Sequence, residues 1–256
     1  MQNPKAEFNI KNVCVLQHTE AEFLGLMEDH FEGRNIGFRY YRPFTESGRV
    51  PPFSEVGEGL VLLGGGPWGA AGTRDAPSLA EEVKFTRACF MQGIPILAVG
   101  LGAQILCLAT DGSVEKSPLV FTCDNARRID DNALNGFMPE EYPNPVYMRD
   151  YPVPPDYAKI LAEDEQGRPA AFQIGDNVLG FTGHPGFKRG MAEDLVMEFE
   201  EAPDNSGAML AEMGRRKIEI EDALVPMMTG IVQITGLMKQ DKDAAEKKGD
   251  TFTGIA

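Results

Sequence analysis

The sequence is poor in the side chains that build metal centres and disulfide frameworks. It has three histidines, His18, His30 and His184, which are too few for a histidine-rich metal site, and we expect neither a metal nor a cofactor. No Cys-x-x-Cys pair occurs among the four cysteines, which are Cys14, Cys89, Cys107 and Cys123. We therefore interpret the cysteines as small buried side chains of a protein in the reducing cytoplasm.

Positive charge is also scarce, because 24 basic residues stand against 39 acidic ones and the net charge is -15. This balance argues against nucleic acid and against anionic membranes as partners. No apolar run reaches the length of a transmembrane helix, and we find no signal-peptide pattern. The length of 256 residues fits one large domain, or one domain with an appendage.

The most informative stretch of the chain runs from residue 94 to residue 111. Its first six residues, 94–99, form an apolar run that is typical of a strand buried on both faces, and residues 103–109 read as a helix. Gly100-Leu101-Gly102 joins the two, and strand, sharp turn and helix together form the geometry of a nucleophile elbow. The apex of this elbow is Gly100, so the turn has a catalytic shape without a nucleophile. A strand, a glycine turn and a helix also occur in α/β folds without any catalytic role.

A second glycine turn follows the strand expected at residues 59–63. Gly64, Gly65 and Gly66 let backbone N–H groups approach a ligand closely. They predict one half of an oxyanion hole, and the amides of the elbow at Leu101 would supply the other half. A plain tight turn explains the glycines equally well, and Trp68 either lines this pocket or packs against its surroundings.

The first half of the chain alternates between strands and helices. We expect strands at 12–16, 36–41, 59–63 and 94–99, a helix at about 20–32 with Thr19 as its N-cap, and a helix at 78–92 with Ser78 as its cap. This order predicts an α/β fold with a mostly parallel central sheet flanked by helices. Both glycine turns then lie at carboxyl ends of strands, where such sheets bind ligands.

Shorter strand patterns follow Gly112, at 119–121, 158–161, 170–174 and 177–182, and Gly175-Asp176 is a hairpin signal. We expect these strands to extend the sheet in antiparallel fashion, and we expect residues 135–156 to be irregular. The last strand leads into the loop Gly183-His184-Pro185-Gly186. A helix at 191–200 closes the core, which gives a first domain at 1–200.

Helical patterns resume at 206–240, as one or two helices with an apolar surface that either the domain or another chain must cover. We interpret 201–240 as a C-terminal helical extension. Residues 241–256 are polar and charged and are expected to form a disordered tail.

Three segments taken together resemble the class I glutamine amidotransferase family, especially its stand-alone, GMP-synthase-like members. They are LVLLGGGPWGA, GIPILAVGLGAQILCLATDGSV and VLGFTGHPGF, and the resemblance covers about residues 12–200. It implies the flavodoxin-like fold of that family, with the helices of 201–240 added to it.

The resemblance also implies which positions would carry catalysis. The family has an elbow of the form Gly-x-Cys-x-Gly-x-Gln and a late His-Pro-Glu motif. The cysteine thiolate attacks the side-chain amide of glutamine. The histidine acts first as base and then as acid, and the glutamate orients the histidine. In this chain the cysteine position is Gly100, the histidine is His184 and the glutamate position is Gly186. The chain keeps Gln104, which helps to bind glutamine in the family, together with Gly102, Gly65 and Gly66, whereas Ala98 replaces the first elbow glycine.

Two of the three catalytic groups are therefore missing, and His184 alone remains as a vestige. Cys107 lies about two helical turns beyond the apex, and Thr182 has no established base, so neither replaces the thiol. An engineered replacement of cysteine would explain Gly100 but not Gly186, and we favour a natural loss.

We predict a degenerate amidotransferase that acts as a binding or structural subunit of a larger enzyme complex. It would form a homo-oligomer or a hetero-complex through its C-terminal helices and offer its cleft to a small anionic or glutamine-like ligand. The alternative is an active glutamine amidotransferase with an altered site, which delivers ammonia to a synthetase partner. A third hypothesis is other hydrolytic or lyase chemistry that uses His184.

Overall fold

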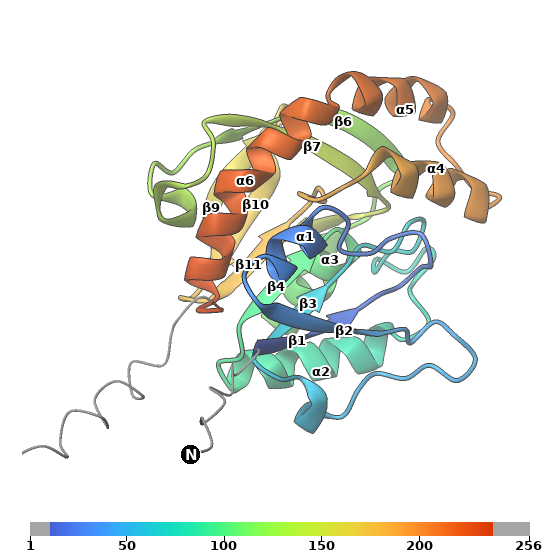
Figure 1. Cartoon of the computed structure of the whole chain (residues 1–256). Helices are drawn as coiled ribbons and strands as arrows, with labels where there is room; N and C mark the ends of the chain where they lie inside the picture. Colours follow the sequence, from blue (N-terminus) through green and yellow to red (C-terminus); the bar gives the residue numbers. More distant parts are fainter. Residues whose placement is uncertain (1–10, 238–256) are drawn as a thin grey trace, which may run out of the picture.

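The computed structural model of the chain describes residues 11–237, and these residues are built around a mixed sheet of nine strands (Figure 1). The strand order is β2-β1-β3-β4-β11-β10-β9-β6-β7. Neighbours are parallel among β2 (Ile36–Tyr41), β1 (Lys11–Leu16), β3 (Gly59–Leu62), β4 (Ile96–Val99) and β11 (Val178–Phe181). They are antiparallel from β11 through β10 (Pro169–Ile174), β9 (Lys159–Asp164) and β6 (Val120–Arg128) to β7 (Glu141–Met148).

Successive strand residues point to opposite faces, and each face has its own helical cover. Leu60 and Leu62 of β3 pack on the side of α2 (Leu79–Met91) and α3 (Leu101–Ala109). Val61 and the following Leu63 pack on the side of α1 (Met27–Glu32) and α6 (Lys217–Ile234). The sheet is thus the middle layer of three, and its strands are buried on both faces, as the apolar runs predict.

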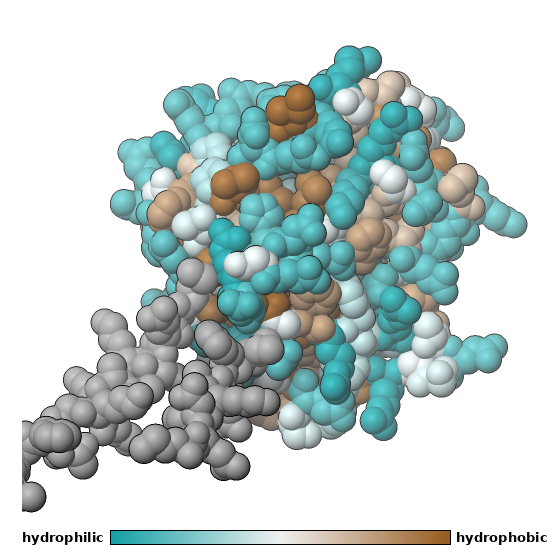
Figure 2. Space-filling model, in the orientation of Figure 1, coloured by the Kyte–Doolittle hydropathy of each residue, from teal (hydrophilic) through white to brown (hydrophobic). Residues whose placement is uncertain are grey.

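The antiparallel half is covered by the C-terminal helices. In Figure 1, α6 runs across β9 and β10, while α4 (Arg189–Glu198) and α5 (Ser206–Arg215) lie beyond β6 and β7. The apolar face of α6 is buried in the core of the sheet through Ile220, Leu224, Met227, Met228, Ile231 and Val232. The sequence left open whether the domain or another chain covers the apolar surface of these helices. For this face of α6, the domain itself covers it. Figure 2 shows that the outer surface of this face is largely hydrophilic, with separate hydrophobic patches.

The predicted α/β class and the antiparallel extension of the sheet are confirmed. The turn at Gly175-Asp176 joins β10 to β11, and the region expected to hold one or two C-terminal helices forms α5 and α6. The remaining short elements are η1 (Phe53–Glu55), η2 (Ala133–Gly136) and the strand pair of β5 (Ser113–Glu115) with β8 (Tyr151–Val153).

Two predictions about local structure were wrong. Residues 135–156 are not irregular, because they contain β7 and β8; Pro143 and Pro145 are tolerated in β7 because it is the edge strand of the sheet. The helix expected at 20–32 comprises only Met27–Glu32. The preceding residues form turns instead, because the hydroxyl of Thr19 accepts a hydrogen bond from the amide of Glu22 and Gly25 has a φ of +64°.

The tail expected at 241–256 lies outside the described residues. Within residues 11–237, no helix is both long enough and apolar enough to cross a membrane.

Candidate functional site

The elbow has the predicted position and shape. Gly100 lies between β4 and α3 with a φ of 55° and a ψ of -117°, and its amide donates a 2.9 Å hydrogen bond to the carbonyl of Phe181. A Cβ atom on Gly100 would lie 3.2 Å from the Cα of Gly64 and 4.0 Å from the carbonyl oxygen of Thr182. The apex therefore faces the ends of the two neighbouring strands, β3 and β11, and a small side chain would fit there after a slight shift.

His184 lies at the end of β11, and backbone groups engage both of its ring nitrogens. Nε2 lies 2.7 Å from the carbonyl oxygen of Phe23, and Nδ1 lies 3.1 Å from the amide of Gly186. Because a carbonyl only accepts and an amide only donates, we assign the neutral ring with its proton on Nε2. The ring is 3% exposed and stacks on Phe187, and burial lowers the pKa of His184 to about 4. In this arrangement neither nitrogen is free to accept a proton from a nucleophile.

The position expected to hold the orienting glutamate has no room for a side chain. A Cβ atom on Gly186 would lie 2.8 Å from the carbonyl oxygen of Leu24 and 2.9 Å from the amide nitrogen of Met27. The amide of Leu26 also donates a 2.9 Å hydrogen bond to the carbonyl of Gly186. The turns that replace the predicted helix therefore pack directly onto the histidine loop.

Glu22, a residue that the sequence analysis missed, occupies the glycine turn after β3. Its carboxylate accepts a 3.0 Å hydrogen bond from the amide of Gly66, and one carboxylate oxygen lies 1.7 Å from the point where Gly64 would carry a Cβ atom. Burial raises the pKa of Glu22 to about 7, although the Gly66 amide and the charge of His18 oppose this shift. The amide that the resemblance assigns to an oxyanion hole already binds a carboxylate of the same chain.

A buried ion pair holds the other side of the same turn. His18 places Nδ1 3.1 Å from the carbonyl oxygen of Gly64 and Nε2 2.7 Å from a carboxylate oxygen of Glu82. Burial alone would lower the pKa of His18, but the charge and hydrogen bond of Glu82 raise it above its usual value. Burial would likewise raise the pKa of Glu82, but His18 and the hydroxyl of Ser78 hold it low. Ser78 occupies the N-cap position of α2, as predicted, but its hydroxyl binds Glu82 and does not cap the helix.

The only sequence signal for this arrangement is the position of His18 and Glu22 just after the first strand. In a parallel sheet such positions lie at the ligand-binding edge, beside the end of the neighbouring strand. Here that neighbour is β3, which leads into the glycine turn. The pairing of His18 with a carboxylate 64 residues away is not visible in the sequence.

The remaining predicted site residues contact other parts of the chain. Gln104 donates a 2.7 Å hydrogen bond from its amide to the carbonyl of Arg149, and its carbonyl oxygen has no partner within the described part of the chain. Leu101 packs so closely on Gly65 that a Cβ atom there would lie 2.3 Å from its side chain. Trp68 stacks with Arg74, whose guanidinium carbon lies 4.9 Å from the ring centroid.

Two side chains near the elbow were considered as substitutes for the thiol. Cys107 is buried in α3, and burial raises the pKa of its thiol to about 12. The hydroxyl of Thr182 lies 3.3 Å from the carbonyl oxygen of Ala170, so it is engaged with the sheet. Among residues 11–237, no group of three or more His, Cys, Asp or Glu side chains is placed to hold a metal ion.

Comparisons with known proteins agree with this architecture. No protein-family model matches the chain. Over 129 residues it is 30% identical to the GMP synthase [glutamine-hydrolyzing] of Aeropyrum pernix, and this stretch covers 49% of our chain but only 23% of that longer protein. A glutamine amidotransferase from Methylobacillus flagellatus superposes with a TM-score of 0.74 at 20% identity, over 88% of this chain and 95% of the other. A glutamine amidotransferase from Thermotoga maritima superposes with a TM-score of 0.73 at 21% sequence identity, over 88% of this chain and 98% of the other. The chain therefore has the fold of class I glutamine amidotransferases over most of its length, and 49% of it is similar in sequence to a GMP synthase.

Proposed function

We propose that this chain is a degenerate class I glutamine amidotransferase-like protein that no longer hydrolyses glutamine and acts as a binding or structural subunit of a larger complex. The observation that carries the proposal is the state of His184, whose two ring nitrogens are engaged by Phe23 and Gly186. A base in this position needs one nitrogen within reach of the nucleophile's proton.

Three further observations support the loss of chemistry. Gly100 has no side-chain atom that could form a covalent bond to an acyl group. Gly186 has no space for a side chain that could orient the histidine. The Gly66 amide, which would stabilise a developing oxyanion, is hydrogen-bonded to Glu22. Because nucleophile, base and oxyanion donor act as one unit, loss of the nucleophile alone reduces the rate by many orders of magnitude.

The proposed subunit role rests on the C-terminal helices and on the relative from Aeropyrum pernix. The inner face of α6 is buried, so a partner would contact its outer face, where Ile218 and Val225 are 70% and 53% exposed and lie two turns apart. The stretch matched in that GMP synthase is less than a quarter of its length, which fits a domain that works beside other parts. A small anionic or glutamine-like ligand would have to displace Glu22 from the Gly66 amide. The free, buried state of all four cysteines supports our placement of the protein in the cytoplasm.

The decisive experiment measures glutamate release from glutamine by the wild-type protein and by Gly100→Cys. We expect none from either, because restoring sulfur at the apex leaves His184 bound to the backbone. Circular dichroism and thermal unfolding confirm that the variant is folded. Glutamate release by the wild type that is lost in His184→Ala would overturn the proposal in favour of an active amidotransferase with an altered site.

The subunit role is tested separately by light scattering on the purified protein and on material isolated from cells. We expect a mass above that of one chain, which falls to the monomer mass in the double variant Ile218→Glu, Val225→Glu. A strict monomer that co-purifies with nothing would contradict this part of the proposal.

A further inference from the structure

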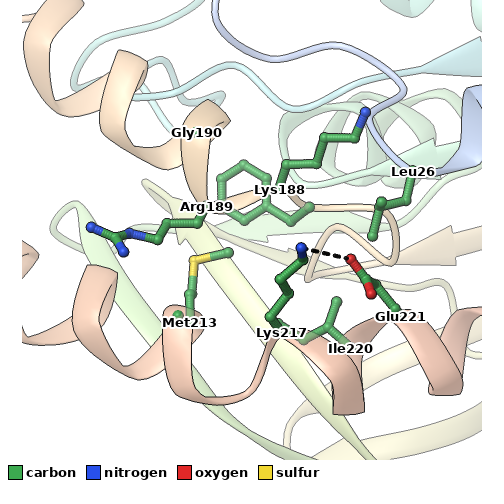
Figure 3. Close-up of a pocket in the computed structure, with 10 residues that line it drawn as sticks. Leu26, Lys188, Arg189, Gly190, Met213, Lys217, Ile220 and Glu221 are labelled. Carbon is green, nitrogen blue, oxygen red and sulfur yellow. Dashed lines mark ion pairs between the residues drawn. The ribbon is translucent and has the colours of Figure 1, made fainter.

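A cavity of about 450 Å³ lies away from the glycine turns, between the first turn of α4 and the junction of α5 with α6 (Figure 3). Its floor is apolar and belongs to the core that these helices share with β6 and β7. The apolar lining consists of Leu26, Phe187, Met213 and Ile220, of which the last three are at most 5% exposed. A cavity of this size and composition is in the range of small-molecule sites.

The rim of this cavity carries positive charge, which is unusual in a chain of net charge -15. Lys188 and Arg189 leave the start of α4 toward opposite sides of the rim, and Lys217 rises from the start of α6 between them (Figure 3). Arg189 reaches across toward Gly214, since a Cβ atom there would lie 3.3 Å from its guanidinium. The cavity therefore combines an apolar floor with three cationic groups from two elements that are distant in sequence.

The acidic groups near the rim only partly neutralise these cations. Arg189 forms a 2.8 Å ion pair with Glu193. The ammonium of Lys217 lies 3.7 Å from the carboxylate of Glu221, and the side chains of Lys217 and Glu221 are both exposed. An exposed pair at that distance contributes little free energy, so a ligand anion can replace Glu221 as the partner of Lys217. The ammonium of Lys188 lies 5.8 Å from the centroid of the Phe23 ring, and no carboxylate within residues 11–237 forms an ion pair with it.

We propose that this cavity binds an amphiphilic organic anion, that is, one carboxylate or phosphate group on an apolar body. The apolar body occupies the floor over Phe187, Met213 and Ile220, and the anionic group pairs with Lys217 at the rim. A simple inorganic anion would leave the floor unfilled, and a neutral apolar molecule would leave the cations unpaired. This site is independent of the glutamine chemistry, so it stands whether or not the proposed loss of activity is correct.

The cavity also touches the structure that encloses His184. Phe187 lines the floor of the cavity and also stacks on the His184 ring, with the two ring centroids 5.6 Å apart. Leu26 lines the wall of the cavity, and its backbone amide donates a hydrogen bond to the carbonyl of Gly186. A bound ligand would thus contact the outer side of the two segments that hold the histidine.

The test uses 8-anilinonaphthalene-1-sulfonate as a fluorescent amphiphilic anion, with decanoate, decanol and inorganic phosphate as competitors. Decanoate is expected to displace the dye and to raise the melting temperature of the wild type, because a ligand that binds only the folded state stabilises it. Binding should weaken as salt is added. Equal displacement by decanol would overturn the role of the anionic group, and displacement by phosphate would overturn the role of the apolar body.

Two matched glycines locate the site. Gly190 and Gly207 both lie in the first turn of a ten-residue helix, and at both a Cβ atom would meet open space, but only Gly190 lines the cavity. Gly190→Leu should weaken dye binding by about tenfold by filling the cavity, while Gly207→Leu should leave it unchanged. Equal effects of the two variants, or no effect of either, would overturn the assignment.

Charge reversal gives a second check. Lys217→Glu should weaken the binding of dye and of decanoate by about three- to tenfold, whereas Lys84→Glu, at an exposed position on α2, should not. Melting curves of all four variants establish that they are folded under the conditions of the titration. Unchanged affinity in a folded Lys217→Glu would overturn the pairing proposed for the anion.

Discussion

The turn at Gly100 and the turn at His184–Gly186 border the same end of the sheet, but they differ in how much of a catalytic geometry they retain. The first keeps the backbone of a nucleophile elbow and has space for a small side chain. In the second, backbone groups of residues 23–27 engage the histidine and fill the space beside Gly186. The elbow therefore has space for a small side chain, whereas backbone packing closes the histidine loop.

This difference separates two ways in which a position can lack a catalytic side chain. At Gly100 the missing element is a chemical group, and the fold would accept it. At Gly186 the missing element is space, because the carbonyl of Leu24 and the amide of Met27 stand where a side chain would be. We therefore expect substitutions at the two glycines to have unequal effects on the stability of the protein.

The largest effect is expected for Gly186→Glu. A carboxylate forced against the backbone of Leu24 and Met27 would be both crowded and buried, so we expect a loss of at least about 4 kcal/mol in the free energy of unfolding. Urea denaturation measures it. Gly190→Ala, four residues further along where nothing lies within 4 Å, is the control and should change stability by about 0.5 kcal/mol or less. A stable Gly186→Glu would show that the loop can reopen, which removes the distinction between the two turns.

A smaller effect is expected from the titration of His184. Because its folded-state pKa is depressed to about 4, the neutral ring contributes stability that is complete above pH 6.5 and is lost as the pH falls toward 4. The stability difference between the wild type and His184→Gln should therefore shrink by up to about 3 kcal/mol over this range.

His18 provides the opposing control for this titration. Its pKa is raised, so its charged form contributes stability below pH 6.5 that is lost as the pH rises through the folded-state value. His18→Gln should therefore differ from the wild type least at high pH. If both histidine variants showed the same pH dependence, the assignment of a neutral His184 and a charged His18 would be wrong.

The smallest effect is expected for Gly100→Cys. A side chain at a φ of +55° costs about 1–2 kcal/mol, and the Cβ contact of 3.2 Å with Gly64 requires only a small shift. Thermal and urea unfolding of this variant and of Gly100→Ala would separate the cost of the backbone conformation from the effect of the thiol on the free energy of unfolding. A loss as large as that of Gly186→Glu would mean that the elbow is as closed as the histidine loop.

Much of the fold followed from sequence patterns, and the reasons for the failures are local. The apolar runs at 59–63 and 94–99 and the glycines after them predicted two buried parallel strands with turns at the same edge. The pattern at 20–32 predicted one long helix, but hydrogen bonds from the Glu22 amide to the Thr19 hydroxyl and from the Leu26 amide to the Gly186 carbonyl stabilise turns over its first part. The strands within 135–156 were missed because proline is compatible with an edge strand, and edge position is a property of the whole sheet.

The sequence by itself determined that the elbow has no nucleophile, because the identity of residue 100 is sufficient for that conclusion. It also determined the α/β class, since the periodicity of apolar residues reports burial directly. Only the tertiary structure decided that Glu22 fills the glycine turn, that His18 pairs with Glu82 and that residues 23–27 enclose His184. These contacts join segments between 44 and 161 residues apart, and no local pattern specifies which distant polar group a buried amide, carbonyl or imidazole will find.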